Sequence, residues 1–256
     1  MIRSFWAIAF NGFREARRNR VTLVLAFFAG LLLLSSSLIT DITVATFDRV
    51  LIDIGLGGMS LILVLLAIFL STGLLSREIE RRTIFMVVSK PVSRGLFLVA
   101  RLAGNMLTLT ALQVLMGALL LLEFWALKTP VTWPTVLAIG MLWFELLLLS
   151  ALGFLMSSFA GQMTSAFVTV SVFFIGHLSG DIYTLARRSK NVGLQLLGKG
   201  VYYVLPNLER LNLRAQASYG VVTPVKVWVG SGVYALAYAG VLVWLAVVLF
   251  RRRDFR

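Results

Sequence analysis

The sequence predicts an all-α membrane protein with six transmembrane helices, an N-terminal interfacial helix and a cytoplasmic helix between the second and third spans. Of its 256 residues, 59% are hydrophobic and only 14% are charged, whereas soluble domains carry roughly 25% charged residues. The apolar residues fall into long runs, and arginines gather between and beyond some of them. With no internal repeat and no low-complexity linker, residues 1–256 are expected to form a single domain.

Residues 1–20 have the pattern of an amphipathic helix. One face carries apolar residues at helical spacing, and the other carries arginines; the apolar set is Ile2, Phe5, Trp6, Ala9, Phe13 and Ala16, and the basic set is Arg3, Arg14 and Arg18. A helix rich in arginine and aromatic residues lies in the membrane interface rather than across it. The alternative is a plain basic tail ahead of the first span.

Six apolar runs are long enough to cross a bilayer, which takes about 17–25 residues of helix. We expect spans at about 21–40, 56–76, 102–122, 135–156, 164–180 and 227–250.

The basic residues set the predicted orientation. Lysine and arginine are enriched in cytoplasmic loops, and the basic segments are residues 3–20, 77–94 and 251–256. Both termini and residues 77–94 are therefore expected in the cytoplasm. Residues 183–226 conflict with this rule, because they are basic and yet six spans place them outside. Their apolar stretches, Val192–Leu197 and Val201–Leu205, are interrupted by glycines and a proline and are expected to be interfacial or re-entrant.

The net charge of +13 has two ordinary explanations. Nucleic-acid binding is one, and basic residues beside a membrane that fix topology and contact anionic lipids are the other. The apolar runs favour the second explanation, so membrane lipids and no nucleic acid are the expected partners.

The segment 77–94 is the most distinctive part of the chain. It joins two apolar runs and holds five basic residues and two acids. Pro91 cannot continue a helix and biases Lys90 to an extended conformation, while Ser93 is a suitable cap for a new helix that starts at Arg94. A helix, a turn and a second helix along the membrane surface are predicted. The residues expected to contact a soluble partner are Glu78, Glu80, Arg81, Arg82, Thr83, Ser89, Lys90, Pro91, Ser93 and Arg94. The alternative is a solvated loop that only fixes topology.

Three polar residues lie within the predicted spans. A charged group at the bilayer centre costs roughly 2.5–3.5 kcal/mol, so Glu145 must be paired, protonated or beside a polar cavity. Gln113 is a candidate partner, and the pair serves either bundle structure or a substrate path. His177, the single histidine, is read as a helix end that reaches interfacial water, with a proton relay as the alternative. One histidine without cysteine makes a poor metal site.

The run Gly193–Gly200 is close to a phosphate-binding loop but lacks the Ser or Thr that follows the lysine in that motif. We therefore expect no cofactor in this chain and no catalytic residue.

The chain resembles the ABC-2-type transporter permeases, and most closely the short six-span NosY-like group. The resemblance rests on four segments: residues 1–20, Arg77–Arg94, Tyr203–Leu213 with its Leu-Pro-Asn motif, and the C-terminal residues Phe250–Phe255. It implies an elbow helix at 1–20 and a coupling helix in 77–94. The implied partners are two copies of an ABC ATPase subunit, which binds ATP and magnesium, and a second permease, identical or paralogous.

The resemblance implies export across the cytoplasmic membrane of a bacterium or archaeon. Two alternatives from other classes remain. An ion-coupled secondary transporter would use Glu145, His177 and Asp181 as proton carriers, and a non-transporting protein would anchor a cytoplasmic assembly.

Overall fold

The computed structural model describes residues 5–7, 9–11, 21–42, 46–80 and 94–252. These residues are helical apart from short connections, and none of them forms a strand. The long helices are α2 (Val21–Ile42), α3 (Phe47–Glu80), α5 (Arg94–Ala126), α6 (Trp133–Ser157), α7 (Gln162–Arg188) and α10 (Val225–Arg252). The shorter ones are α8 (Val192–Val204), the 3-10 turn η1 (Glu209–Leu211) and α9 (Arg214–Ser218).

Five of the described helices are long and apolar enough to cross a membrane: Phe47–Gly73, Gly95–Ala126, Trp133–Ser157, Gln162–Arg188 and Val225–Phe250. They contain the third to the sixth predicted spans and residues 56–73 of the second, so the prediction of a helical multi-pass membrane protein is confirmed at this level. The first predicted span corresponds to α2, whose apolar part, Leu23–Leu38, is shorter.

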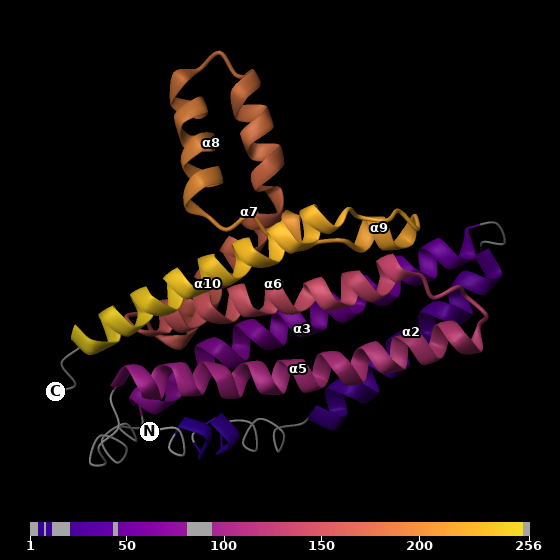
Figure 1. Ribbon diagram of the computed structural model, residues 1–256, viewed down its shortest axis with the longest axis horizontal. Helices are drawn as coiled ribbons and strands as arrows, with labels where there is room; N and C mark the ends of the chain where they lie inside the picture. Colours follow the sequence, from indigo (N-terminus) through magenta and orange to yellow (C-terminus); the bar gives the residue numbers. More distant parts are fainter. Residues whose placement is uncertain (1–4, 8, 12–20, 43–45, 81–93, 253–256) are drawn as a thin grey trace.

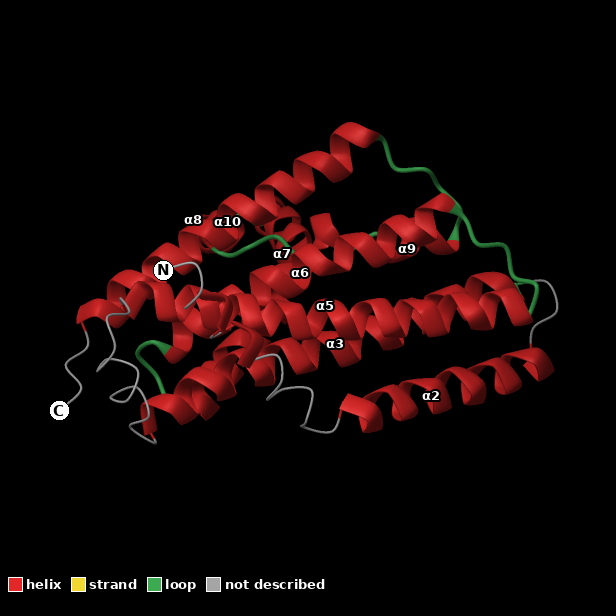
Figure 2. Cartoon of the chain, turned by 60° about the horizontal axis from the view of Figure 1, so that its bottom comes forward, coloured by secondary structure: helices red, strands yellow, loops and turns green. Residues whose placement is uncertain are grey.

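The bundle is built around α6. Its apolar window is 67% buried, against 28–50% for the other four long spans, and it packs on α3, α5, α7 and α10. Helices α3, α5, α6 and α10 run lengthwise through the bundle, and α2 lies along one side (Figures 1 and 2). Helix α3 ends at Glu80, and α5 begins at Arg94. Both of these helix ends lie at the end of the bundle where α10 also ends (Figure 1).

The contact between α3 and α6 depends on small side chains. A methyl group at Gly153 of α6 would overlap Ser71 of α3, and the hydroxyl of Ser157 donates to the carbonyl oxygen of Thr72 at 3.4 Å. Small residues allow membrane helices to approach closely. The small residues therefore let α3 and α6 pack closely against each other.

The start of α3 lies nine residues before the predicted second span, at Phe47 instead of 56. Two aspartates in this extension explain why hydropathy alone missed it. Asp48 accepts a hydrogen bond from Thr129 at 2.8 Å, and Asp53 accepts one from Ser218. Because the polar groups have partners, the helix continues through them.

Helices α7 and α8 form a hairpin that projects from one side of the bundle (Figure 1). The predicted interruption of residues 192–205 at the glycines is wrong, because α8 runs unbroken through Gly198 and Gly200 and ends before Pro206. Gly198 has a packing role instead, since a methyl group there would overlap Ala186 of α7. The tyrosine rings of Tyr183 and Tyr202 stack 4.7 Å apart between the two helices.

The part of residues 183–226 that packs into the bundle is Leu205–Ser218, which we call the inserted segment. Its apolar side chains Leu208, Leu211, Leu213 and Ala217 are buried against α3, α6 and α7. The amide of Leu208 donates to the carbonyl oxygen of Gly176 in α7 at 3.2 Å. Residues 192–205, which were expected to be interfacial or re-entrant, instead form α8, and the segment that packs into the bundle follows this helix.

The predicted elbow helix falls partly outside the described residues. Residues 5–7 and 9–11 are helical, and Ala9 is buried while Trp6 and Phe10 are exposed. A methyl group at Gly104 of α5 would come within 2.6 Å of the carbonyl oxygen of Ala9. This short stretch thus packs directly on α5, and a helix over all of residues 1–20 stays a prediction.

Candidate functional site: a buried polar cluster around Glu145

Glu145 is the most deeply buried acid in the described part of the chain. It lies at the middle of α6, with 2% of its surface exposed, because α6 is the central helix. A carboxyl group removed from water needs a polar or charged neighbour. The neighbours come from α7 and from the inserted segment.

His177 of α7 is the direct neighbour of Glu145. Its Nε2 lies 3.5 Å from Glu145 Oε1, while its Nδ1 lies 3.1 Å from the carbonyl oxygen of Phe173. The ring also packs on Phe173, with 4.7 Å between the ring centroids. The expectation that His177 marks a helix end is wrong, because α7 continues to Arg188 and the imidazole faces the interior of the bundle.

Gln113 is not the partner of Glu145. Its amide nitrogen donates to the backbone carbonyl oxygen of Ile139 in α6 at 2.5 Å, so this side chain joins α5 to α6 one face away from Glu145. The same interface has a second bond, from the indole nitrogen of Trp143 to Thr110 at 2.9 Å. The side chains of Gln113 and Trp143 therefore serve helix packing.

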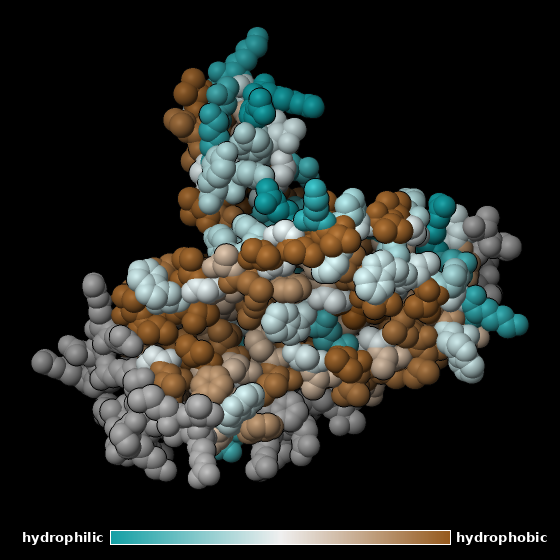
Figure 3. Space-filling view, in the orientation of Figure 1, coloured by the Kyte–Doolittle hydropathy of each residue, from teal (hydrophilic) through white to brown (hydrophobic). Residues whose placement is uncertain are grey.

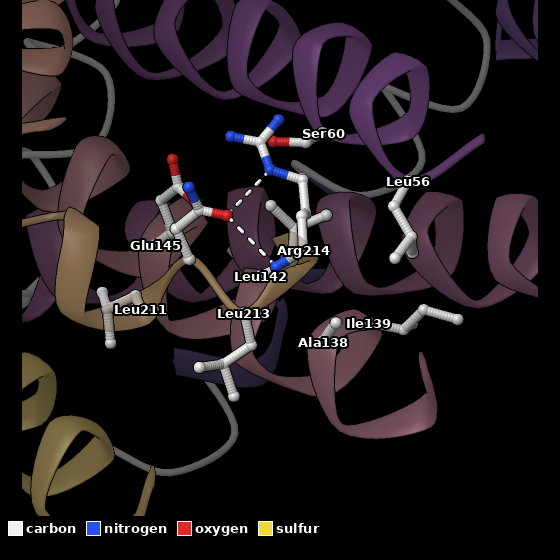
Figure 4. A pocket seen from close by; sticks show the side chains of 10 residues that line it. Leu56, Ser60, Ala138, Ile139, Leu142, Glu145, Leu211, Leu213 and Arg214 are labelled. Carbon is white, nitrogen blue, oxygen red and sulfur yellow. Dashed lines mark hydrogen bonds between the residues drawn. The ribbon is translucent and has the colours of Figure 1, made fainter. Parts of the chain in front are cut away.

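Arg214 brings a positive charge to the other side of Glu145. Arg214 and Glu145 line one small pocket, together with Ser60 of α3 (Figure 4). Asn212 orients the arginine, because its Oδ1 accepts from the Arg214 backbone amide at 3.3 Å and from Nε at 2.9 Å. The volume of the pocket is about 10 Å³, enough for roughly one water molecule.

A second, larger cavity lies on the other side of the inserted segment. Its volume is about 620 Å³, and it is open to the surroundings between α7, the inserted segment and α10. Its polar lining includes Asn207, Glu209, Arg210, Gln216 and Ser231. Asn212 and Leu213 line both this cavity and the small pocket at Glu145, so the inserted segment separates the two.

The carboxyl group of Glu145 and the imidazole of His177 can hold or pass a proton, and Arg214 can balance charge inside the bundle. A carboxyl and an imidazole side by side form either a neutral hydrogen bond or an ion pair, depending on where the proton lies. Arg214 and Glu209 are close enough to both groups to interact with them electrostatically. Arg214 and Asn212 both belong to the inserted segment, so the position of this segment decides whether they lie next to Glu145.

The sequence contains a signal for the inserted segment. Arg214 follows a run in which leucines alternate with polar residues, at 208, 211 and 213. An arginine next to leucines that are buried must itself reach a polar site, but the sequence does not show which helix supplies it. Asp181, the third candidate proton carrier, is exposed on α7.

The residues expected to contact an ATPase lie at or beyond the described helix ends. Glu78 and Glu80 belong to the last turn of α3, which continues the span without a break. Arg81, Arg82, Thr83, Ser89, Lys90, Pro91 and Ser93 lie outside the described residues. Helix α5 begins at Arg94, where a helix start was predicted.

Within the described residues, no group of three or more His, Asp or Glu side chains is placed to hold a metal ion. The glycine-rich run 193–200 lies in helix α8. No protein-family model matches the chain, and no curated protein sequence matches it.

Proposed function

We propose that the chain is the membrane-spanning permease subunit of an ABC transporter that exports its substrate with ATP hydrolysed by a separate subunit. The observation that carries the proposal is the charged segment 77–94, which joins α3 and α5 at the end of the bundle where α10 also ends. A charged segment that joins two helices at one end of a bundle suits contact with a soluble partner. The resemblance to ABC-2 permeases over this segment supports the identity of that partner.

The interior of the bundle supports a transport role. A membrane anchor has no need of a carboxyl group at its centre, since intramembrane ionisable residues are costly and mark pathways or relays. Here Glu145 faces His177, and the inserted segment separates this cluster from an open cavity of about 620 Å³. In the proposed mechanism, ATP-driven motion of α3 and α5 displaces the inserted segment and joins the two cavities.

The expected assembly is a pair of permeases with two ATPase subunits in a bacterial or archaeal cytoplasmic membrane. Affinity purification of the tagged chain from its native membrane in mild detergent tests this. The purified complex should contain a nucleotide-binding subunit and hydrolyse ATP with magnesium. A complex that carries no such subunit under conditions that preserve other membrane assemblies would contradict the proposal.

A second candidate is an ion-coupled transporter, which the contact between Glu145 and His177 favours. The two candidates differ in what drives the motion. Proteoliposomes containing the complex distinguish them, because a pH gradient without ATP would quench a trapped pH-sensitive dye through the secondary transporter and leave it unchanged with the ABC permease.

A further inference from the structure

The hairpin of α7 and α8 is the part of the molecule that the proposed function leaves unexplained. Beyond Gly180 it packs on itself and projects from the bundle (Figure 1). Many of its large apolar side chains are exposed: Leu185, Val192, Leu194, Leu196, Leu197 and Val204. Apolar side chains gather along one edge and polar ones along the other edge and the tip (Figure 3).

A groove runs between the two helices of the hairpin. Its volume is about 300 Å³, and its lining is apolar except for one polar residue, Ser189, which lies where α7 ends. Ile182 and Val201 line the groove, as do Leu185, Leu194 and Leu197. An apolar groove of this volume suits a hydrocarbon chain.

The tip of the hairpin is strongly basic. Arg187, Arg188 and Lys190 surround Ser189, and all three side chains are exposed. Asp181 is the one acidic residue between 181 and 204. Long basic side chains of this kind reach for the interface of a bilayer and attract anionic lipid.

We propose that the α7–α8 hairpin is a binding site for an anionic glycerophospholipid. An acyl chain occupies the groove between α7 and α8, and the phosphate contacts the basic tip formed by Arg187, Arg188 and Lys190. This proposal does not depend on an ATPase partner. It accounts for three of the seven basic residues in 183–226 that conflict with the positive-inside rule, because these three serve lipid binding rather than orientation.

The test uses the full chain in phosphatidylcholine nanodiscs that contain a small fraction of phosphatidylglycerol with a photoreactive diazirine in its acyl chain. After illumination, the crosslinked peptides are mapped by mass spectrometry. Labelling of residues 182–201 should exceed that by the matching phosphatidylcholine probe by at least about fivefold. Equal labelling by the two probes would overturn the proposal.

Two double variants, each of which removes two exposed cations, show whether labelling depends on the charges of the tip or on the net charge of the protein. Arg187→Gln with Arg188→Gln should reduce hairpin labelling by the phosphatidylglycerol probe several-fold, whereas Lys128→Gln with Lys226→Gln should leave it unchanged. Labelling of α2 serves as the control for intact insertion in both variants. Equal loss in both variants contradicts a site at the tip.

Inorganic phosphate at matched ionic strength should not reduce labelling, and displacement by it would mean that a free anion, not a lipid, occupies the tip.

Discussion

Glu145 of α6 and His177 of α7 face each other inside the bundle, with 3.5 Å between Glu145 Oε1 and His177 Nε2. Neither of these two atoms makes a hydrogen bond within the described residues, and an unsatisfied buried polar group costs about 1–3 kcal/mol, so each side chain depends on the other as its polar neighbour. The pair therefore joins the central helix to the helix that carries the projecting hairpin. Arg214 from the inserted segment completes the cluster on the other side.

The Glu145 and His177 side chains should be energetically coupled. Glu145→Leu and His177→Leu should each destabilise the protein by about 1–3 kcal/mol, because each leaves a buried polar partner. The double variant should lose less than the sum, since the interaction is lost once. Glu145→Gln, which keeps a hydrogen-bonding amide, should stay closer to the wild type.

Thermal unfolding of the purified chain in detergent measures these effects for all four variants under one set of conditions. Additive shifts in the midpoint temperature would show that the two side chains do not interact.

The packing of the inserted segment against α7 should depend on Gly176. A methyl group there would come within 2.7 Å of the carbonyl oxygen of Pro206 and 3.0 Å of Leu208 Cγ. Gly176→Ala should therefore destabilise the protein by about 1–3 kcal/mol, the usual effect of overpacking. Gly180→Ala is the matched control on the same helix, because its methyl group meets nothing within 4 Å, and alanine favours a helix by up to about 1 kcal/mol.

Thermal midpoints of the two glycine variants give the comparison. If Gly176→Ala is as stable as Gly180→Ala, the inserted segment does not pack against α7 in the membrane.

Two glycines of α6, Gly153 and Gly140, allow the same test of the contact between α3 and α6. A methyl group at Gly153 would overlap Ser71, so Gly153→Ala should lower the yield of folded protein and its thermal midpoint. Gly140 of the same helix faces open space, and Gly140→Ala should be neutral or slightly stabilising. Size-exclusion profiles and thermal midpoints measure both, and equal behaviour would contradict the close packing of α3 on α6.

The predicted orientation is directly measurable, because the chain has no native cysteine. Val222→Cys lies at an exposed position after the inserted segment and should react with a membrane-impermeant maleimide from outside intact cells. Thr83→Cys should react only after the membrane is permeabilised. Arg214, in the same outer segment, is a poorer reporter because it lines the pocket at Glu145. Reaction of position 222 only after permeabilisation would overturn the six-span orientation.

The sequence predicted the apolar centres of the helices well because hydropathy over about 20 residues is a strong signal. It missed helix ends where polar residues have tertiary partners. Asp48 and Asp53 appear to break an apolar run, but Thr129 and Ser218 satisfy them, and α3 runs through. In the same way, α7 continues past Gly180 because α8 packs on its extension.

The partner of Glu145 was not predictable from the sequence. Which face of a transmembrane helix points at which neighbour depends on the rotation of all the helices, and the sequence suggested only Gln113 as a candidate partner. The structure turns Gln113 toward the backbone of Ile139 and His177 toward Glu145. The insertion of residues 205–218 depends on the same long-range packing.

The central claim, coupling to an ATPase through residues 77–94, is tested most directly by reversing two charges. Glu78→Lys with Glu80→Lys changes the last turn of α3 without altering the apolar part of any span, so the protein should still insert. Like charges placed at an interface can cost several kcal/mol. The matched control is Asp41→Lys with Asp181→Lys, which reverses two acids elsewhere.

The measurement is the amount of ATPase subunit that co-purifies with each variant, with membrane insertion monitored in parallel. We expect the Glu78 and Glu80 double variant to insert normally and to lose the ATPase subunit, while the Asp41 and Asp181 variant keeps it. Wild-type levels of co-purified ATPase with the Glu78 and Glu80 variant would show that residues 77–94 are a loop that only fixes topology, and would contradict the proposed function.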